Sequence, residues 1–363
     1  MGQDHAPLVT PGEISDDVDL LRLMIRDQEA QSGVYQPGRY WTAYARRTAR
    51  AIEQEGLDRF RAVPSIAKGY ADVIIDDPAD LWGGDNWKGR LLQRVAHLGV
   101  VRRHLLRPYL SKLDAQTTEI QAHKAEIYNA RYADDMDELI GGIDIDTTRG
   151  GTRDVVDVAG REIASVYLRY AVQIASADRR VALDDVRSVC EVGGGFGASM
   201  HLLLERHPNV RKAVYVDIAP ILYVGTQYLR SFFGSAVRDY RATRDLAEIR
   251  FADDDAREIL CLAPWQLERV VADVELFWNS SSFREMDPGQ VRLYAAQAKR
   301  LGARAILLFA PPIEVGSGLS TSYADVVDAF GPEISFEPLE MDPPDVNGEA
   351  AVIGRHANGT ARL

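Results

Sequence analysis

An apolar run that leads directly into a cluster of glycines limits most strictly how this chain can fold. Residues 188–192 are typical of a buried strand, and four glycines follow within residues 193–197 before a helical run begins. Glycine tolerates positive φ and lets the backbone pass close to a ligand, and the first turn of a helix adds unpaired N–H groups at the same place. The segment therefore predicts a strand–loop–helix unit of an α/β sheet, with a ligand at the carboxyl end of the strand.

The pattern of the chain changes at about residue 186. Short β-rich runs then alternate with helical runs, which predicts a parallel sheet with helices on both faces. We expect strands over 188–192, 213–216, 259–262, 274–278 and 305–309, helices over 197–207, 220–233 and 288–301, and a terminal hairpin from 334–336 and 350–353.

The sequence pattern of the first half instead predicts helices separated by turn-rich segments. Helical stripes cover residues 20–25, 91–106 and 163–174, and the polar, glycine-rich segment 141–152 is predicted to be a mobile loop over a site. We therefore predict two domains, a helical N-terminal domain over residues 1–180 and a Rossmann-like domain over 181–363.

The net charge and the hydrophobic content of the chain limit the kinds of molecule that it is expected to bind. The chain has 363 residues, 46% of them hydrophobic, and a formal net charge of −12. An acidic chain without a basic run is a poor candidate for binding nucleic acid or an anionic membrane, and no stretch has the length of a membrane span. We expect a cytoplasmic protein with small-molecule partners and leave open whether it forms a homo-oligomer. Cys190 and Cys261 lie in apolar runs and are expected to be buried and reduced.

An acid after the second predicted strand indicates a nucleoside ligand. Asp217, with its neighbour Ile218, lies one strand–helix–strand passage after Glu191, where a carboxylate accepts hydrogen bonds from two ribose hydroxyls. The glycines also permit a dinucleotide pattern of the NAD type, which by itself is a weak signal.

Two features favour S-adenosylmethionine over a dinucleotide. Glycines recur at every second position, as Gly193, Gly195 and Gly197, and Glu191 precedes the first of them by two residues. S-adenosylmethionine has no pyrophosphate for a helix N-terminus to hold. Its sulfonium and amino groups are cationic, and an acid at the loop suits them.

Three segments together resemble the class I S-adenosylmethionine-dependent methyltransferases, and more narrowly the bacterial sugar O-methyltransferases. They are residues 191–197 with Asp217, the turn 264–267, and the segment 277–286. Upstream of these segments, the same family has an arginine and spaced tyrosines, which Arg161, Tyr167 and Tyr170 resemble. The resemblance covers residues 155–310 well. It implies a Rossmann-like class I methyltransferase domain and methyl transfer to a sugar hydroxyl or a glycosylated natural product, with the helical half as lid and acceptor site.

The resemblance also implies roles for individual residues. The turn 264–267 would flank the adenine, with Trp265 or Leu267 packed on its ring and Gln266 bonded to its amino group. Asn279 and Ser280 would lie beside the methionine part of the cofactor. Asn279 is also a candidate for the catalytic site.

Glu285 is our candidate for a catalytic base, because a hydroxyl is a weak nucleophile at neutral pH. His123 is the next candidate for that role. Asp287 is expected instead to cap a helix that has Pro288 at its first position. The histidines show no metal-ligand spacing, so no metal is predicted.

Two alternatives remain open. One is an NAD(P)-dependent oxidoreductase, which uses the same kind of loop and ribose acid. The other is a non-catalytic protein that retains the methyltransferase fold. Such a protein is expected to carry a broken glycine loop or to lack the ribose acid, and both are intact in this sequence.

Overall fold

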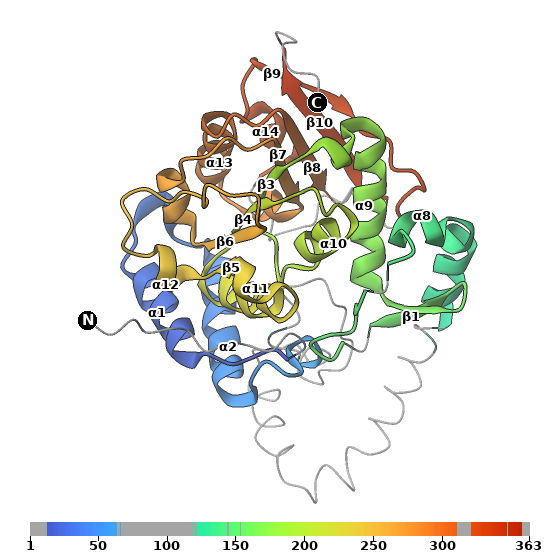
Figure 1. Cartoon of the computed structure of the whole chain (residues 1–363), viewed down its shortest axis with the longest axis horizontal. Helices are drawn as coiled ribbons and strands as arrows, with labels where there is room; N and C mark the ends of the chain where they lie inside the picture. Colours follow the sequence, from blue (N-terminus) through green and yellow to red (C-terminus); the bar gives the residue numbers. More distant parts are fainter. Residues whose placement is uncertain are drawn as a thin grey trace, which may run out of the picture.

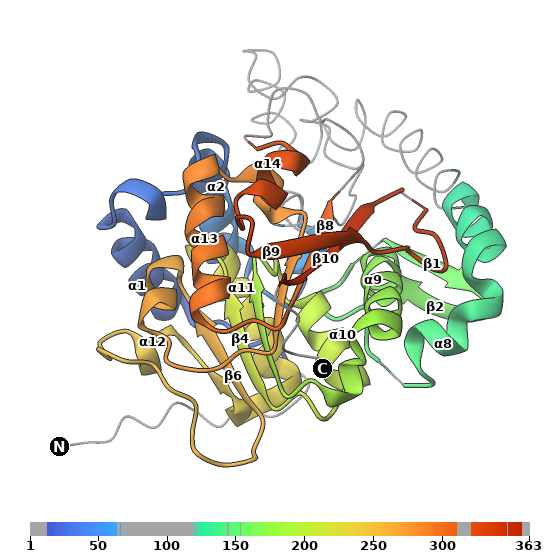
Figure 2. The ribbon, with the colours of Figure 1, turned by 90° about the horizontal axis from the view of Figure 1, so that it is seen from above.

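The central element of the fold is a mostly parallel sheet with helices on both sides (Figures 1 and 2). The computed structural model describes residues 13–63, 66, 119, 122–143, 145–152, 154–310, 321–346 and 348–357. The helix predicted over residues 91–106 lies outside these residues. The architecture is a Rossmann-like α/β fold, as the sequence predicts.

The order of the strands places a topological switch at the glycine loop. The eight strands lie in the order β5-β6-β4-β3-β7-β8-β10-β9, and only β10 runs antiparallel to its neighbours. The chain moves outward from β3 in one direction and then returns to place β7 on the other side of β3. Ligands of such sheets bind at the carboxyl ends of the strands at this point. The strands are β3 (Ser188–Val192), β4 (Lys212–Val216), β5 (Val237–Arg238), β6 (Glu258–Leu262), β7 (Leu276–Ser280), β8 (Ala305–Ala310), β9 (Ile334–Pro338) and β10 (Ala350–His356).

Side chains of successive strand residues enter two different cores. Val189 and Trp278 belong to the core on the side of α9 (Ser165–Val181), α10 (Ala198–Arg206) and α11 (Ala219–Phe233). Cys190 and Phe277 belong to the core on the side of α13 (Pro288–Arg300) and α14 (Tyr323–Asp328). Both faces of the sheet are therefore covered, which explains why its strands read as nearly continuous apolar runs.

Elements of the first half pack on the sheet domain. Helices α1 (Val18–Glu29) and α2 (Arg39–Glu55) both contact α11, and one core cluster runs from Ile14 to Ile353. Two short 3-10 turns, η1 (Gly33–Tyr35) and η2 (Phe60–Ala62), flank α2. The predicted domain boundary near residue 180 falls at the end of α9, whose buried side packs against α10.

A small hairpin precedes α9. Strands β1 (Val155–Val158) and β2 (Arg161–Ala164) pair through the two residues Ala159 and Gly160, both with positive φ, as a tight hairpin requires. The helical stripe predicted from residue 163 therefore begins two residues later, at Ser165. Residues 122–132 are also helical, followed by η4 (Ala133–Asp135) and α8 (Met136–Ile140), which packs on α9.

The segment 141–152 is held down at two points. Arg61 Nη1 donates to the carbonyl oxygen of Thr147 at 2.6 Å, and Arg149 Nη1 donates to that of Ser231 at 2.8 Å. The described part of this segment is thus tied both to η2 and to α11.

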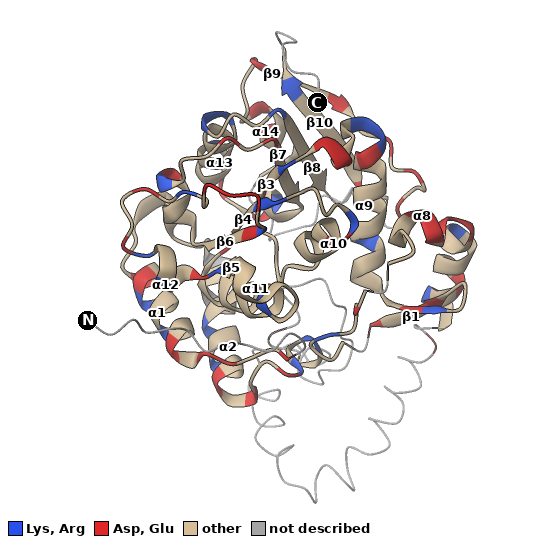
Figure 3. Cartoon of the chain, viewed as in Figure 1, with Lys and Arg blue, Asp and Glu red and all other residues tan. Residues whose placement is uncertain are grey.

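Basic and acidic residues alternate along the described helices, strands and loops, and neither kind is confined to one part of the ribbon in Figure 3. None of the described helices combines the length and the apolar character that a membrane crossing requires.

Candidate active site

The glycine loop joins β3 to α10 and leaves no space for a side chain at Gly193 or Gly194. Gly193 has a φ of 72°, and a Cβ there would lie less than 3.0 Å from Ser282 Oγ. A Cβ on Gly194 would meet the ring of Tyr215, also at less than 3.0 Å. Tyr215 in turn donates its hydroxyl to the carbonyl oxygen of Gly195. At Gly193 and Gly194 the loop therefore packs against side chains that would clash with any residue larger than glycine.

Backbone N–H groups of this loop bond within the protein. The Gly193 N–H donates to the carbonyl oxygen of Val216 at 2.8 Å, and the Gly195 N–H donates to Asp217 Oδ2 at 3.0 Å. The Gly197 N–H donates to a carbonyl within the loop at 3.0 Å. Three amides of the glycine loop are therefore already engaged within the protein.

Asp217 lies at the end of β4 and faces the loop. Its Oδ1 accepts from the Ile218 N–H at 2.7 Å, and its Oδ2 accepts from the Gly195 N–H. Burial raises the pKa of Asp217 to about 8, although these two backbone bonds lower it. A carboxylate oxygen can accept more than one hydrogen bond, so both oxygens retain capacity for hydroxyl groups of a ligand.

The end of β7 lies beside the glycine loop. Asn279 Nδ2 donates to the carbonyl oxygen of Val192 at 2.8 Å and to Ser282 Oγ at 2.6 Å, and its Oδ1 accepts from the Phe283 N–H at 3.3 Å. Asn279 is only 2% exposed. The Asn279 side chain is therefore buried, and its hydrogen bonds hold in place the backbone that carries Ser280, Ser281 and Ser282.

Glu285 ends the 3-10 turn η8 (Ser282–Glu285) that follows β7. Burial raises the pKa of its carboxyl to about 7, while a hydrogen bond from Trp41 and the charge of Arg169 both lower it. Trp41 belongs to α2, so the first half of the chain reaches this carboxyl directly. A group with this pKa is suited to exchange a proton near neutral pH.

Residues 33–38, which we call the strap, connect α1 to α2 across the same region. Gln290 Nε2 of α13 donates to the carbonyl oxygens of Val34 and Gln36, each at 3.0 Å. Tyr35 donates its hydroxyl to Glu268 of the turn η7 (Pro264–Arg269). The strap is thereby fixed to two elements of the sheet domain.

All these elements border one cavity of about 270 Å³. Six residues predicted from the sequence line it, namely Gly193, Gly195, Asp217, Ile218, Ser280 and Glu285. The others are Tyr35, Pro37, Gly38, Trp41, Arg169, Tyr170, Phe196, Ile221, Pro264, Ser281, Ser282, Met286, Gln290 and Tyr294. Aromatic rings and two carboxyl groups dominate this lining.

Five other predicted residues do not line the cavity: Glu191, Gly197, Trp265, Gln266 and Asn279. Gly197 begins α10, and a Cβ there would contact Leu229 of α11, so its part is in helix packing. Glu191 is 2% exposed, and its Oε1 accepts from Ser199 Oγ. Burial raises the pKa of Glu191 to about 7. A Cβ on Gly194 would lie 2.8 Å from its Oε2, so Glu191 lies close to the loop on the core side.

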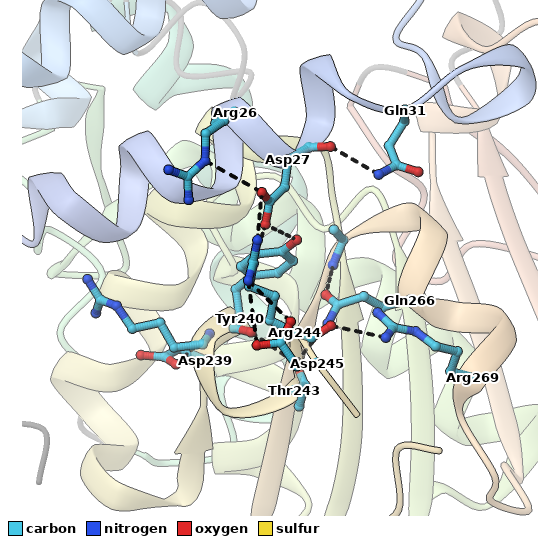
Figure 4. A network of polar contacts seen from close by, with 12 residues as sticks. Arg26, Asp27, Gln31, Asp239, Tyr240, Thr243, Arg244, Asp245, Gln266 and Arg269 are labelled. Atoms are coloured by element: carbon cyan, nitrogen blue, oxygen red, sulfur yellow. Dashed lines mark hydrogen bonds and ion pairs between the residues drawn. The ribbon is translucent and has the colours of Figure 1, made fainter. Parts of the chain in front are cut away.

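Gln266 is bonded within the protein and is fully buried (Figure 4). Its Oε1 accepts from the Ala263 N–H at 2.8 Å, and its Nε2 donates to Thr243 Oγ1 at 2.9 Å. Figure 4 also shows Asp27 of α1 meeting Arg244 and Tyr240 of the neighbouring segment. Trp265 packs edge-on against Tyr240 at 6.1 Å between ring centroids. Pro264 is the residue of this turn that reaches the cavity.

Arg169 is a site residue that the sequence reasoning missed. It lies on α9, lines the cavity, and forms an ion pair with the buried carboxylate of Glu349. Its Nη2 also donates to Ser281 Oγ at 2.5 Å. The partners lie 180 and 112 positions away in sequence, so no local pattern around Arg169 marks it. Tyr35 and Trp41 also line the cavity and are likewise absent from the residues predicted from the sequence.

The remaining predictions concern His123 and metals. The side chain of His123 is 73% exposed and lies near Glu126, and it does not line the cavity. Within the described ranges, no group of three or more acidic, histidine or cysteine side chains could hold a metal ion. Asp287 caps α13 as predicted: its N–H donates to Gln290 Oε1 at 3.1 Å, and Pro288 occupies the first turn.

No protein-family model matches the sequence, and no curated protein matches it significantly. Solved structures do align with it. The pyocyanin biosynthetic protein PhzM aligns at 14% identity and a TM-score of 0.34, over 52% of this chain and 58% of PhzM. Human N-acetylserotonin methyltransferase, solved with S-adenosylmethionine, aligns at 12% identity and a TM-score of 0.31, over 52% of this chain and 56% of that enzyme. The alignment thus spans little more than half of either protein.

Magnesium protoporphyrin IX methyltransferase from Synechocystis PCC 6803, solved with S-adenosylmethionine, aligns at 11% identity and a TM-score of 0.33. That alignment covers 65% of this chain and 97% of the enzyme. The fold assignment of this chain follows from its own strand order and from the position of its glycine loop.

Proposed function

We propose that this protein is an S-adenosylmethionine-dependent O-methyltransferase that acts on a sugar hydroxyl or a glycosylated natural product. The observation that carries the proposal is that Asp217 and Glu285 line one cavity, together with the tightly packed glycine loop at the topological switch. In this proposal Asp217 holds the donor and Glu285 serves the acceptor. The intact loop and acid also argue against a protein that has lost its activity.

The residues present fit S-adenosylmethionine better than a dinucleotide. The glycine loop passes so close to Ser282 that a Cβ on Gly193 would clash with that side chain. Three N–H groups of the loop are engaged in hydrogen bonds within the protein. A pyrophosphate would compete with these bonds and would face the carboxyl groups of Asp217 and Glu285. A cationic sulfonium is attracted by the same two groups when they are ionised.

Asp217 would hold the donor by accepting hydrogen bonds from its two ribose hydroxyls, while Ile218 and Pro264 supply apolar contact. When bound, S-adenosylmethionine supplies an electrophilic methyl group on sulfonium. Glu285 would accept the proton of the acceptor hydroxyl as its oxygen bonds to that methyl group, with the S–C bond breaking in line. Much of the rate is expected to come from holding the two reactants in this alignment.

The first half of the chain, predicted as the helical domain over residues 1–180, would supply the acceptor side. Tyr35, Trp41 and Tyr170 line the cavity and offer ring faces on which a sugar or a flat aglycone can stack. The strap, tied to α13 through Gln290, would exclude water from the reacting groups. The two free, buried cysteines agree with the cytoplasmic location that we propose.

The test is a transfer assay with tritium-labelled S-adenosylmethionine and a panel of free sugars, glycosides and matching aglycones. We expect label in a sugar-containing product, and none when the accepting hydroxyl of that compound is already methylated. Label in the aglycone alone would overturn the sugar assignment. Transfer to none of these compounds, together with oxidation of NADPH, would overturn the methyltransferase assignment itself.

A further inference from the structure

Opposite Asp217, the cavity is bordered by a fixed arginine. Arg169 lies on α9, and its Nε donates to Glu349 Oε1 at 2.8 Å while its Nη2 donates to Ser281 Oγ at 2.5 Å. Gln173, one turn further along α9, donates to Glu349 Oε2 at 2.7 Å and to Ser280 Oγ at 3.1 Å. These bonds hold the guanidinium in one place, as a built binding site requires.

The side chain of Glu349 is only 2% exposed, so it would be costly to bury without a cation. Burial by itself lowers the pKa of Arg169, but the charge and hydrogen bond of Glu349, with smaller contributions from Tyr170 and Asp345, raise that pKa above its ordinary value, so the guanidinium stays charged. The bonds of Nε and Nη2 use three of the five donors of a guanidinium. Among the described residues none accepts from Nη1, which leaves two donors for a ligand.

The separation between the carboxyl ends of β4 and β7 suits the length of the donor, from its nucleoside to its amino-acid end. Asp217 follows β4 and Ser281 follows β7, and these strands are separated only by β3. Neighbouring strands lie about 4.8 Å apart, so the two strand ends are roughly 10 Å apart. A nucleoside held at Asp217 and passing over Gly193 and Gly195 would bring its amino-acid end to Ser281 and Arg169.

We propose that Arg169 binds the carboxylate of the donor's amino-acid end, and that Glu349 and Gln173 hold it for that purpose. The inference rests on the proposed function, because it assigns the far end of the same donor. Arg169 thereby selects a ligand with a carboxylate over a nucleoside that lacks one. Bonds between a charged donor and a charged acceptor are the strong kind, with planar guanidinium geometry suited to carboxylates.

The test compares two ligands by calorimetry, S-adenosylhomocysteine and its decarboxylated analogue S-adenosyl-3-thiopropylamine. The second keeps the nucleoside, the thioether and the amino group and lacks only the carboxylate. We expect Arg169→Met to weaken binding of S-adenosylhomocysteine by about 10- to 100-fold and to leave binding of the amine nearly unchanged. An equal loss for both ligands, or no loss for either, would overturn the assignment.

Two further variants keep this result interpretable. Arg169→Met with Glu349→Gln removes the unpaired buried carboxylate, and we expect this double variant to fold and to show the same selective loss. Arg179→Met is the matched control, since Arg179 lies on the same helix and pairs with Glu138 and Asp342 away from the cavity. We expect it to bind both ligands as the wild type does.

The wild-type protein separates this inference from the proposed function. If the wild type binds S-adenosylhomocysteine and Arg169→Met binds it equally well, only the role of Arg169 is wrong, and a rise in the acceptor's KM would then assign Arg169 to an anionic acceptor. If the folded wild type binds neither ligand, the proposed function itself is wrong.

Discussion

Asn279 Nδ2 donates to the carbonyl oxygen of Val192 at 2.8 Å, across 87 positions of sequence. The bond joins the end of β7 to the end of β3, where the glycine loop begins. The same amide nitrogen donates to Ser282 Oγ, the atom that a Cβ on Gly193 would strike. One buried side chain therefore sets the spacing between the loop and the serine-lined face of the cavity.

The Asn279→Ala variant should lose both stability and cofactor affinity. The variant leaves the Phe283 N–H without its partner, at about 1–3 kcal/mol, and leaves the Val192 carbonyl with only the bond from Ser282 Oγ at 3.2 Å. We expect the loop then to shift relative to Ser282. Urea unfolding and calorimetry with S-adenosylhomocysteine measure the two effects. Asn209→Ala is a matched control, because Asn209 Nδ2 also donates to two backbone carbonyls, at 2.9 and 2.7 Å, outside the cavity. If both variants bind the ligand like the wild type, the bond of Asn279 is only structural.

The Gly193→Ala variant should bind S-adenosylhomocysteine much more weakly. A Cβ at this position meets Ser282 Oγ and Cβ, and the φ of 72° is unfavourable for alanine. We expect about 1–3 kcal/mol of lost stability from strain and overpacking. In Gly289→Ala the new methyl group meets nothing within 4 Å, so this variant should behave as the wild type. Combining Gly193→Ala with Ser282→Gly should restore part of the affinity; no restoration would show that the clash is not the cause.

Asp217 should control both the strength and the pH dependence of donor binding. Removing it in Asp217→Ala leaves two ribose hydroxyls without acceptors, at about 1.5–3 kcal/mol, or roughly ten- to a hundredfold in affinity. Since the pKa of Asp217 is raised to about 8, its carboxyl is mostly protonated at pH 7 and must ionise to accept from both hydroxyls. Affinity should therefore increase as the pH rises through about 8, with a proton released on binding. Calorimetry across pH 6.5–9 measures this in the wild type and in Asp217→Asn, where the change should disappear.

Glu285 should control turnover rather than donor binding. With a pKa raised to about 7, its carboxyl is a base above that pH and an acid below it, so turnover at saturating donor should rise through pH 7. Glu285→Gln should lower turnover by about 10²–10⁴-fold and flatten this rise. Its affinity for S-adenosylhomocysteine should stay close to that of the wild type. Full activity of this variant at saturating acceptor would make Glu285 a bystander, and Tyr170 would be the next residue to replace.

Local patterns in the sequence predict most strands and helices of the second half, but β7 begins at Leu276, two residues later than predicted, and the short strand β5 is not predicted. The run before Gly193 becomes β3 with its predicted bounds, and Asp287 caps α13, because both depend on residues close together in the chain. The β1–β2 hairpin is missed because its strands are four residues long and Ile163 also fits the helical stripe that continues into α9.

Contacts between segments that are far apart in the sequence explain the remaining differences between the predicted site and the site in the structure. Gln266 was predicted to face the adenine, but whether its amide is available depends on Thr243, 23 positions away, with which it bonds. Arg169 becomes a site residue only through Ser281 and Glu349, which approach it from β7 and the segment before β10. Trp41 reaches Glu285 because α2 folds back onto the sheet domain. A sequence pattern carries no signal for such pairings.

The most direct test of the central claim is a calorimetric titration of the purified protein with S-adenosylhomocysteine, NADH and NADPH under identical conditions. Because three of the loop amides are engaged and two carboxyl groups line the cavity, we expect micromolar-range binding of S-adenosylhomocysteine and no measurable heat with either dinucleotide. Tight binding of NADPH with no response to S-adenosylhomocysteine would contradict the assignment.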